Sequence, residues 1–544
     1  MSTQAGSGTG PYARRYSAGV IEREPFMGRA IRQSKLTVGS LFRDTGEDGS
    51  SSVTLPWQSI GAYCINNVSA KVVLALYPPG TAFVNLKPTK EALEGLQELD
   101  ATERGTIKAE IDKGLSGVEQ EFIDCIEEDG DRWRLFDAVR HLVVGGNHGL
   151  KIDKDSILQS IPLGQYVTWR NKRGDLLEFV VEDGLTFETM SEDLQAFAIQ
   201  NGYEVSYEDN ANKQPKANQK PINVYTRGVL KNGQWKVGQE MCGSLIPGTE
   251  WTYDADALPY MFIRMVALEG EHYGRSYCED YEADLQTLDG FWQIMTEGAA
   301  AGALLKWLIR PGGSTNKKRF DETANGGSLT GEADDVHAVR ADKGGDMSVA
   351  RDIAQAVETR LAKIFLLYSS VQRAGERVTR EEIITIRQDL EATFGGVYSN
   401  LVIAFQAPYA RLKMASLTKQ KRLTKLPKGA VKVTILTGDA GLGRALKSQT
   451  LDEAIGAAKN IFGDSVNEYL IVSNYLSRSF ANKAIDPEGL VRTQEEVDEN
   501  RQQAVQQQTV ASVVPEVVKQ GGAMLQQEQA AELAQEAPAP QQAL

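Results

Sequence analysis

The sequence predicts an α+β protein that is mainly helical. Long stretches repeat apolar residues at three- and four-residue steps, as amphipathic helices do. Residues 160–245 instead contain pairs of β-rich runs joined by turn residues, which is the signal of antiparallel hairpins. Two long helical stretches then enclose a short polar insert. Helices of that length exceed the usual helix of a globular domain and indicate a spanning role.

The composition is that of an ordinary globular protein. The chain has 544 residues, of which 41% are hydrophobic and 24% charged, and its net charge is −14 at pH 7. Tight binding of nucleic acid needs clustered Lys and Arg, so this balance argues against a tight grip but allows DNA to slide past. We expect the four cysteines to be buried reduced thiols, because none stands at metal-ligand spacing: Cys64, Cys125, Cys242 and Cys278.

Neither a signal peptide nor a membrane span is expected. Residues 1–10 are rich in Ser, Thr and Gly and contain no apolar segment. No apolar run approaches the roughly 20 residues that cross a bilayer. We therefore expect the chain to be made and folded in a cytoplasm.

The first 146 residues are predicted to form an arm followed by helices. Residues 1–20 resemble a flexible arm. A helix is expected from Thr54, with Pro56 in its first turn, and two more at 89–128 and 131–144, the last ending at Gly145-Gly146. The buried stripe of the first helix is Trp57, Ile60, Cys64, Val68, Val72 and Leu76.

Two hairpins follow in a mixed body that extends to about residue 268. The first joins residues 166–169 to 176–181 through the turn 171–174. The second covers 222–242, with Asn232-Gly233 as its tight turn.

The two long helices are expected at 275–305 and 347–371. The first would be about 45 Å long at 1.5 Å per residue. Between them, the polar residues 306–346 are predicted to hold two short strands, at 307–309 and 336–340, and a brief helix at Lys317-Lys318-Arg319. The two apolar stripes are Tyr277, Tyr281, Leu285, Leu288, Trp292 and Met295 on the first helix, and Val349, Ile353, Val357, Leu361, Ile364 and Tyr368 on the second.

Helical periodicity stops at 372–377 and restarts at a capping box formed by Thr379 and Glu382. The new helix is weakened at Gly395-Gly396 and resumes toward Pro408. A strand at 431–436 and helix over about 446–482 come next. Beyond about residue 495 the chain is rich in Gln, Ala and Glu, and we expect its last dozen residues to be disordered.

No arrangement of residues predicts catalysis, a metal or a cofactor. The phosphate-binding pattern G-x-x-x-x-G-K-[ST] does not occur, and the glycines at 438–443 are interpreted as a connecting loop. The four histidines do not stand at the spacing of a zinc hydrolase, so we interpret them as scattered helix-face or loop residues. The acidic runs at 127–129 and 279–282 are interpreted as solvated faces rather than as metal or acid–base sites. We expect a protein that is not an enzyme and that uses no cofactor.

Four segments, in order along the chain, resemble the portal, or head-to-tail connector, proteins of short-tailed lytic bacteriophages. The strongest is Ser370 to Ile383, with Leu390-Glu391 and 395–399 after it. Residues 150–260, the insert at 306–346 and the last hundred residues match this family much less well. The other three segments are Pro56–Pro78, Leu142–Asn147 and Ile263–Tyr277.

The resemblance implies the portal fold, which has a wing, a stem, a clip, a tunnel loop and a C-terminal helical crown. Under this assignment, residues 1–20 are the flexible arm and 21–274 the wing. The two stem helices are 275–305 and 347–371, the clip between them is 306–346, and the tunnel loop is 372–379. Residues 380–445 are the kinked helix and the return to the wing, 446–500 are the crown helices, and 501–544 are a Gln/Ala-rich, partly disordered tail.

The resemblance also implies the function. Such a protein forms a ring, of twelve subunits in the family, at one capsid vertex, through which viral DNA is packaged and ejected. The expected partners are other copies of the chain, the terminase large subunit, a tail adaptor protein, the major capsid and scaffold proteins, internal core proteins and double-stranded DNA that passes without specific binding, with no membrane. The protein would be assembled in the host cytoplasm and reside in the virion.

Two residue groups are candidates for binding, and each has a second interpretation. The tunnel loop contains Gln372, Arg373, Gly375, Glu376, Arg377 and Thr379. Its arginines could contact phosphates where the channel is narrowest, or form intersubunit or helix-cap ion pairs with Glu376, Glu381 or Asp389. In the clip, Lys317, Lys318 and Arg319 could bind a partner or DNA, or form a solvated face. Another phage structural protein, such as an internal core or scaffold component, is the main alternative for the whole chain, and the packaging ATPase is a remote one.

Overall fold

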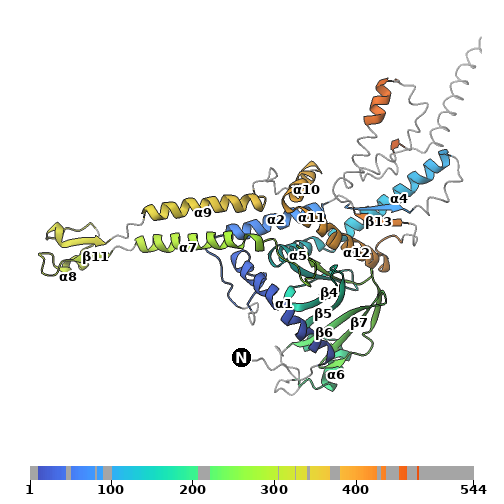
Figure 1. The fold of residues 1–544 in the computed structure, drawn as a ribbon, viewed down its shortest axis with the longest axis horizontal. Coiled ribbons are helices and arrows are strands. Elements are labelled where there is room, and N and C mark those ends of the chain that lie inside the picture. The colour runs from blue at the N-terminus through green and yellow to red at the C-terminus, as the bar shows by residue number, and fades with distance from the viewer. Residues whose placement is uncertain are drawn as a thin grey trace, which may run out of the picture. The chain divides into compact units, whose positions relative to one another are not determined.

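The computed structural model describes residues 10–44, 51–79, 83–89, 101–205, 221–303, 306–324, 326–339, 344–367, 380–425, 431–435, 453–461, 463 and 475–476. The chain divides into two compact units. The first comprises residues 1–85, 121–427 and 433–438, and the second comprises 86–120, 428–432 and 439–544. The two larger sheets, the two long helices and the insert between them belong to the first unit (Figure 1).

The chain begins its described part with helix α1 (Pro11–Leu36), which corrects the expectation of a flexible arm for residues 11–20. The start of α1 lacks a capping side chain of its own. The buried carboxylate of Glu240, from strand β7, replaces it by accepting hydrogen bonds from the backbone N–H groups of Tyr12 at 2.6 Å and Ala13 at 3.1 Å. A carboxylate at a helix N-terminus also stabilises the helix dipole. These distant contacts could not be inferred from the arm's local sequence.

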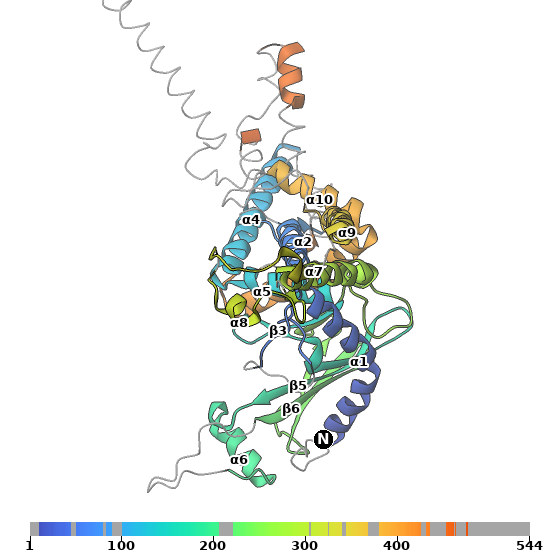
Figure 2. The same ribbon diagram turned by 90° about the vertical axis from the view of Figure 1, so that its left-hand side faces the viewer.

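Helix α1 lies along one face of the main sheet, against β4, β5 and β6 (Figures 1 and 2). Arg15 holds it there in two ways: its guanidinium pairs with Glu178 of β5 at 2.8 Å and lies 3.7 Å from the ring centre of Trp169 on β4. The sheet has the strand order β4-β5-β6-β7-β8, with β9 also paired to β7. Its strands are β4 (Tyr166–Arg170), β5 (Leu176–Leu185), β6 (Ile222–Lys231), β7 (Gln234–Met241), β8 (Ser244–Leu245) and β9 (Trp251–Asp254).

Both predicted hairpins are confirmed. Strands β4 and β5 pair antiparallel, and so do β6 and β7. Asn232 and Gly233, between β6 and β7, both have positive φ, at 52° and 78°. That backbone suits the tight turns whose twist matches a hairpin, which explains why Asn-Gly is a strong turn signal.

A smaller sheet of order β10-β2-β3 carries helix α5 (Asp131–Gly145). The predicted end of this helix at Gly145-Gly146 is confirmed. Gly146 has a φ of 73°, and a side chain there would collide with the backbone of Arg275. The strands are β2 (Asn147–Ile152), β3 (Leu158–Ile161) and β10 (Tyr260–Arg264).

Helix α2 (Ile60–Leu76) packs against α5 and begins later than expected. Pro56 and Trp57 precede it outside any helix, and the Trp57 side chain is half exposed rather than part of the buried stripe. The reason is tertiary, because the Trp57 backbone N–H donates a hydrogen bond of 2.7 Å to Asp289 of helix α7 (Glu282–Ala303). The stripe from Cys64 to Leu76 is buried as predicted.

Between residues 380 and 419 the helices are α10 (Arg380–Phe394), α11 (Gly396–Leu401), a π-helical turn (Val402–Gln406) and α12 (Ala407–Lys419). The predicted weakness at Gly395 is confirmed as a break between α10 and α11, where Gly395 has a φ of 54°. The π-helical turn ends two residues before Pro408, which cannot donate a backbone hydrogen bond.

Of the helix expected over 89–128, residues 101–128 are helical as α4 (Ala101–Glu128). Before it, β1 (Val84–Pro88) pairs with β13 (Val431–Ile435). Residues 90–100 lie outside the described part of the chain. Of the helix expected at 446–482, residues 453–461 are helical. The Gln/Ala-rich segment beyond residue 495 and the glycines at 438–443 are also outside the described residues. None of the described helices combines the length and apolarity that a membrane span requires.

Candidate functional site: a helix pair with a polar insert

The two long helices predicted from the sequence pair with each other. They are α7 (Glu282–Ala303) and α9 (Gly344–Ile364), which lie side by side and run antiparallel (Figure 1). An ion pair of 2.5 Å joins Asp284 of α7 to Arg360 of α9. The apolar core of the pair consists of Leu285 and Leu288 from α7 with Ala354, Val357 and Leu361 from α9.

Each long helix is shorter than expected, for a reason that lies in the surrounding structure. Before α7, Arg275 forms a β-bridge with Val266, and residues 279–281 form a 3₁₀ turn. Tyr277 therefore belongs to a buried aromatic cluster with Phe365 and Phe394 rather than to the helix stripe.

Helix α9 ends at Ile364. Just after it, Asn67 of α2 donates to the carbonyl oxygens of Phe365 at 3.0 Å and Leu366 at 3.2 Å, and the buried Lys71 also binds Leu366. Leu366 has a positive φ of 56°, which ends the helix. The groups that stop α9 thus come from a helix almost 300 residues earlier in the chain.

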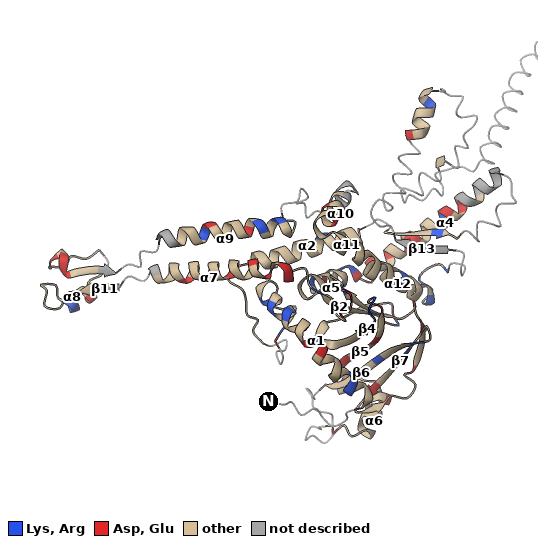
Figure 3. Cartoon of the chain, viewed as in Figure 1, with Lys and Arg blue, Asp and Glu red and all other residues tan. Residues whose placement is uncertain are grey.

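Charge is divided unequally between the two helices (Figure 3). Helix α7 carries four acidic residues and no Lys or Arg, whereas α9 carries both signs. The acidic residues near the start of α7 are engaged by the body: Glu282 pairs with Arg32 of α1 at 3.2 Å, and Asp289 accepts the Trp57 N–H. These contacts fix the base of the pair against α1 and the segment before α2.

The insert between the helices folds as predicted. Strand β11 (Lys306–Ile309) pairs antiparallel with β12 (Val336–Val339), and α8 (Lys317–Glu322) lies between them in sequence. Trp307 packs edge-on against Phe320 of α8, with ring centres 5.3 Å apart. Among the described residues, the hydrogen bonds and the ring contact of the insert join residues of the insert to each other, which gives it a small core of its own.

Asp335 is the central polar residue of the insert and is buried. Its carboxylate accepts hydrogen bonds from the Ser314 hydroxyl and the Thr315 N–H, both at 3.0 Å. Burial by itself raises the pKa of the Asp335 carboxyl, but the hydrogen bonds from Ser314 and Thr315 outweigh it and lower the pKa overall. Gly313 approaches this carboxylate so closely that an added methyl group would collide with it.

The three predicted partner-binding residues of the insert lie together on α8. Lys317, Lys318 and Arg319 are all exposed, and their side chains form no ion pair with any described residue. Asn316 caps this short helix by accepting the backbone N–H groups of Lys318 at 3.0 Å and Arg319 at 3.3 Å. The sequence thus placed this basic group correctly on a brief helix, and the structure presents it to solvent.

The predicted channel residues lie outside the described part of the chain. They are Gln372, Arg373, Gly375, Glu376, Arg377 and Thr379. Helix α10 begins at Arg380, directly after the residue predicted to cap it.

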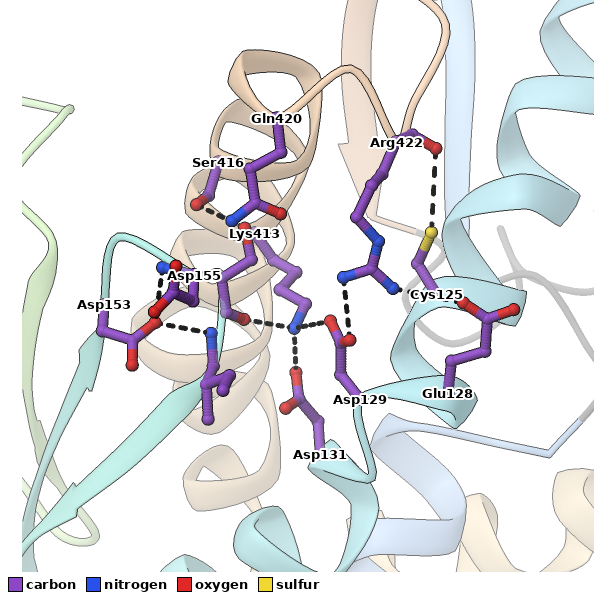
Figure 4. Close-up of polar contacts among 12 residues, drawn as sticks. Cys125, Glu128, Asp129, Asp131, Asp153, Asp155, Lys413, Ser416, Gln420 and Arg422 are labelled. Atoms are coloured by element: carbon purple, nitrogen blue, oxygen red, sulfur yellow. Dashed lines mark hydrogen bonds and ion pairs between the residues drawn. The ribbon is translucent and has the colours of Figure 1, made fainter.

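One polar cluster was missed by sequence reasoning (Figure 4). In the acidic run 127–129, Glu127 and Glu128 are exposed as expected, but Asp129 belongs to this cluster and is not part of a solvated face. The fully buried ammonium group of Lys413, on α12, pairs with Asp129 and Asp131, each at 2.7 Å. Arg422 also binds Asp129, at 2.8 Å. Burial alone raises the pKa of the Asp129 carboxyl, but the hydrogen bonds from Lys413 and Arg422 lower it overall.

The histidines are also less scattered than expected. His141 of α5 and His148 of β2 are both buried, with ring centres 4.7 Å apart. Burial lowers the pKa of each imidazole, and for His148 the neighbouring His141 lowers it further. The seven-residue spacing crosses a helix end, so no periodic pattern could have paired them.

No described residues form a group of three or more side chains suited to hold a metal ion. Of the cysteines, three are buried as expected, and Cys242 is half-buried; all four are free thiols.

The chain that has this mixed fold and long helix pair also matches a known protein family over most of its length. Residues 11–463 match the family described as "Bacteriophage head to tail connecting protein". The chain belongs to this family of bacteriophage head-to-tail connecting proteins, which confirms the resemblance noted in the sequence.

The similar proteins carry a more particular name. The portal protein of Enterobacteria phage T3 is 30% identical over 92% of this chain and 91% of its own length. The portal protein of Escherichia phage T7 is 33% identical over 80% of each chain, and that of Enterobacteria phage SP6 is 27% identical over 78% of each. A chain from the structure titled "Neck of native GTA particle computed with C12 symmetry" aligns over 73% of this chain and 85% of its own with 10% identity, but its TM-score of 0.31 is too low to add to the argument.

Proposed function

We propose that this chain is the subunit of a portal ring at one vertex of a bacteriophage capsid, the channel through which viral DNA is packaged and ejected. Membership of the head-to-tail connecting family and the similarity to three portal proteins support this function. The protein acts as a structural component and not as an enzyme.

The observation that carries the proposal is the apolar surface of the α7–α9 pair. Trp292, Ile294, Val349 and Ile353 are all exposed, although each belongs to or borders an apolar stripe. A two-helix pair cannot bury all sides of both helices, so contact with further helices is needed to remove this surface from water. Identical helix pairs arranged around an axis supply that contact for every copy.

The proposed function gives each part of the structure a role in a portal subunit. We assign α7 and α9 to the stem, residues 306–346 to the clip, and the sheets with α1, α2 and α5 to the wing. The clip presents Lys317, Lys318 and Arg319 to the packaging motor and then to the tail. Residues 372–379 are assigned to the tunnel loop, on the sequence alone, with Arg373 and Arg377 facing DNA or neighbouring loops.

The charge of the chain supports a channel rather than a DNA-binding surface. A net charge of −14 in every subunit makes the ring as a whole repel a duplex, so DNA passes without being held. The partners follow from the place of the ring: the terminase motor, the tail adaptor, the capsid and scaffold proteins and internal core proteins. The ring is assembled in the host cytoplasm and remains in the virion.

Native mass measurement of the purified chain tests the proposal. We expect a closed ring of about 700 kDa, which is the mass of twelve copies of the 59.6 kDa chain. A negatively stained image should show a central hole. A chain that stays monomeric or dimeric over the concentrations used for assembly would overturn the proposed function.

A further inference from the structure

The turn between β4 and β5 (residues 171–174) is held by two arginine side chains that share one acceptor. Arg170, at the end of β4, donates to the carbonyl oxygens of Gly174 at 2.9 Å and Phe262 at 2.6 Å. Arg264, at the end of β10, donates to the same Gly174 oxygen at 3.5 Å. Two positively charged guanidinium groups therefore lie within hydrogen-bonding distance of one oxygen atom.

Neither guanidinium group is neutralised by a carboxylate. Both bind backbone carbonyl oxygens, and neither forms an ion pair with any carboxylate that the structure describes. The acidic side chains of the same region have other partners. Asp175 accepts a hydrogen bond from the Asn171 side chain at 2.8 Å, and Glu271 pairs with Arg275 at 2.8 Å. The positive charge at the β4–β5 turn is therefore left uncompensated.

The two charges repel each other. Burial, and after it the charge of Arg264, lowers the pKa of the Arg170 side chain to about 10. An anion bound beside the two groups would relieve this repulsion, whereas a neutral ligand would not. Arg170 uses three of its five N–H groups and Arg264 uses two, so both keep donors for such a ligand.

The turn itself adds two more positive charges. Lys172 and Arg173 are exposed, and neither forms an ion pair within the described part of the chain. Gly174 allows the close approach of the guanidinium groups, because it has a φ of 94° and a side chain there would collide with Arg264. Four cationic side chains thus gather at one turn of a chain whose net charge is −14.

We propose that the β4–β5 turn is a binding site for phosphate groups, and that duplex DNA at the ring supplies them. Guanidinium groups match phosphate oxygens with paired N–H donors, while Lys172 and Arg173 are free to contact neighbouring phosphates of the same backbone. Because the rest of the chain is acidic, the contact is local and strongly dependent on salt. The inference rests on the proposed function only for the source of the phosphate, and its site lies on the main sheet, apart from the proposed clip and tunnel loop.

Retention of a covalently closed circular duplex on a filter by the full chain tests the site. A circle has no end to thread through a ring, so it reports binding outside a channel. Lys172→Ala combined with Arg173→Ala should weaken retention by roughly fivefold at low salt, and the slope of log affinity against log salt should become shallower by about two. The matched control combines Lys419→Ala with Lys425→Ala, which removes the same charge from two exposed positions elsewhere in the first unit. The control should retain the circle as the wild type does.

The outcomes separate this site from the ring itself. Equal retention by the turn variant and the control, both in rings of native mass, would overturn the site and leave the proposed function standing. A wild-type chain without rings would overturn the proposed function, and loss of retention in the turn variant alone would still support the phosphate site. Displacement of the circle by inorganic phosphate, but not by chloride at equal ionic strength, would support the site. Polyglutamate that displaces the circle as well as a short duplex of equal charge would point to an acidic protein partner and overturn the assignment to phosphate.

A second variant tests the guanidinium pair. Arg264→Gln removes one of the two charges and keeps a side-chain N–H for the Glu271 carbonyl oxygen, which Arg264 binds at 2.9 Å. We expect the variant to retain less of the circle and to lose the displacement by inorganic phosphate. Retention and displacement equal to those of the wild type would show that the pair takes no part in binding.

Discussion

Lys413 shows how one buried charge ties distant parts of the chain together. Its ammonium group lies between Asp129 and Asp131 and also binds the Ser156 carbonyl oxygen at 2.5 Å (Figure 4). Tyr409 completes the cluster by donating to Asp131 at 2.7 Å. The cluster joins α12 to the junction of α4 and α5.

We expect Lys413→Met to lower the stability of the subunit by about 3–5 kcal/mol, because it removes the buried cation that lies 2.7 Å from both Asp129 and Asp131. Thermal melting should show this as a clear fall in midpoint. Lys419→Met, an exposed position on the same helix, is the matched control and should change the midpoint little. Equal melting of the two variants would mean that the cluster does not stabilise the fold.

The buried pair His141 and His148 predicts acid sensitivity. The pKa values of both imidazoles are lowered in the folded chain, so the unfolded chain binds more protons. Stability is therefore complete above the unfolded pKa of about 6.5 and is lost as the pH falls below it. Around the pair, Asp137 favours protonation of His141, whereas burial and Arg140 oppose it.

The measurement is the melting temperature between pH 7 and pH 5 for the wild type and for His148→Gln. Glutamine keeps a polar partner for the Ser160 hydroxyl, which lies 3.0 Å from the His148 ring nitrogen, but it does not titrate. The variant should lose less stability over this range. Parallel curves for the two proteins would exclude His148 as the source of acid sensitivity.

At the scale of elements, the insert between α7 and α9 is a separate small fold. Asp335, Ser314 and Thr315 hold its loops, and Trp307 packs on Phe320. Among the described residues, its hydrogen bonds and ring contact join residues within the insert, so we expect the body to fold without them. This independence suits a docking element, because the sequence and shape of the insert can change without disturbing the core of the body.

Replacing residues 312–335 with a short linker should leave ring assembly intact and abolish DNA packaging and tail attachment. A finer variant replaces Lys317, Lys318 and Arg319 with Ala and keeps the Asn316 cap, so that only the charges are lost. We expect this triple variant to form rings and to package poorly. Loss of rings in the linker variant would place the insert in the subunit contact and contradict the division between stem and clip.

At the scale of the whole molecule, the proposed ring reconciles two properties that conflict in a single chain. The subunit exposes apolar groups along α7 and α9, and it carries a net charge of −14. Assembly removes the apolar groups from water, while the negative charge keeps the assembled channel from binding the DNA that moves through it.

The sequence alone determined the local elements and the family. Periodicity predicted α5 and the central parts of both long helices, and Asn232-Gly233 predicted a hairpin turn. The basic group of α8 was also predicted to lie on a brief helix. These predictions succeeded because helix and turn signals depend on residues that are close in sequence. The order helix, insert, helix followed from composition shifts that need no knowledge of packing. Four ordered motifs identified the family.

Only the tertiary structure decided where elements begin and end and which charges are buried. Helix α1 exists because Glu240 of β7 supplies its cap, and α9 stops where Asn67 and Lys71 of α2 bind its last carbonyl groups. Lys413 is buried because two carboxylates from nearly 300 residues away neutralise it. Such partners are close in space and remote in sequence, so a local pattern carries no signal of them.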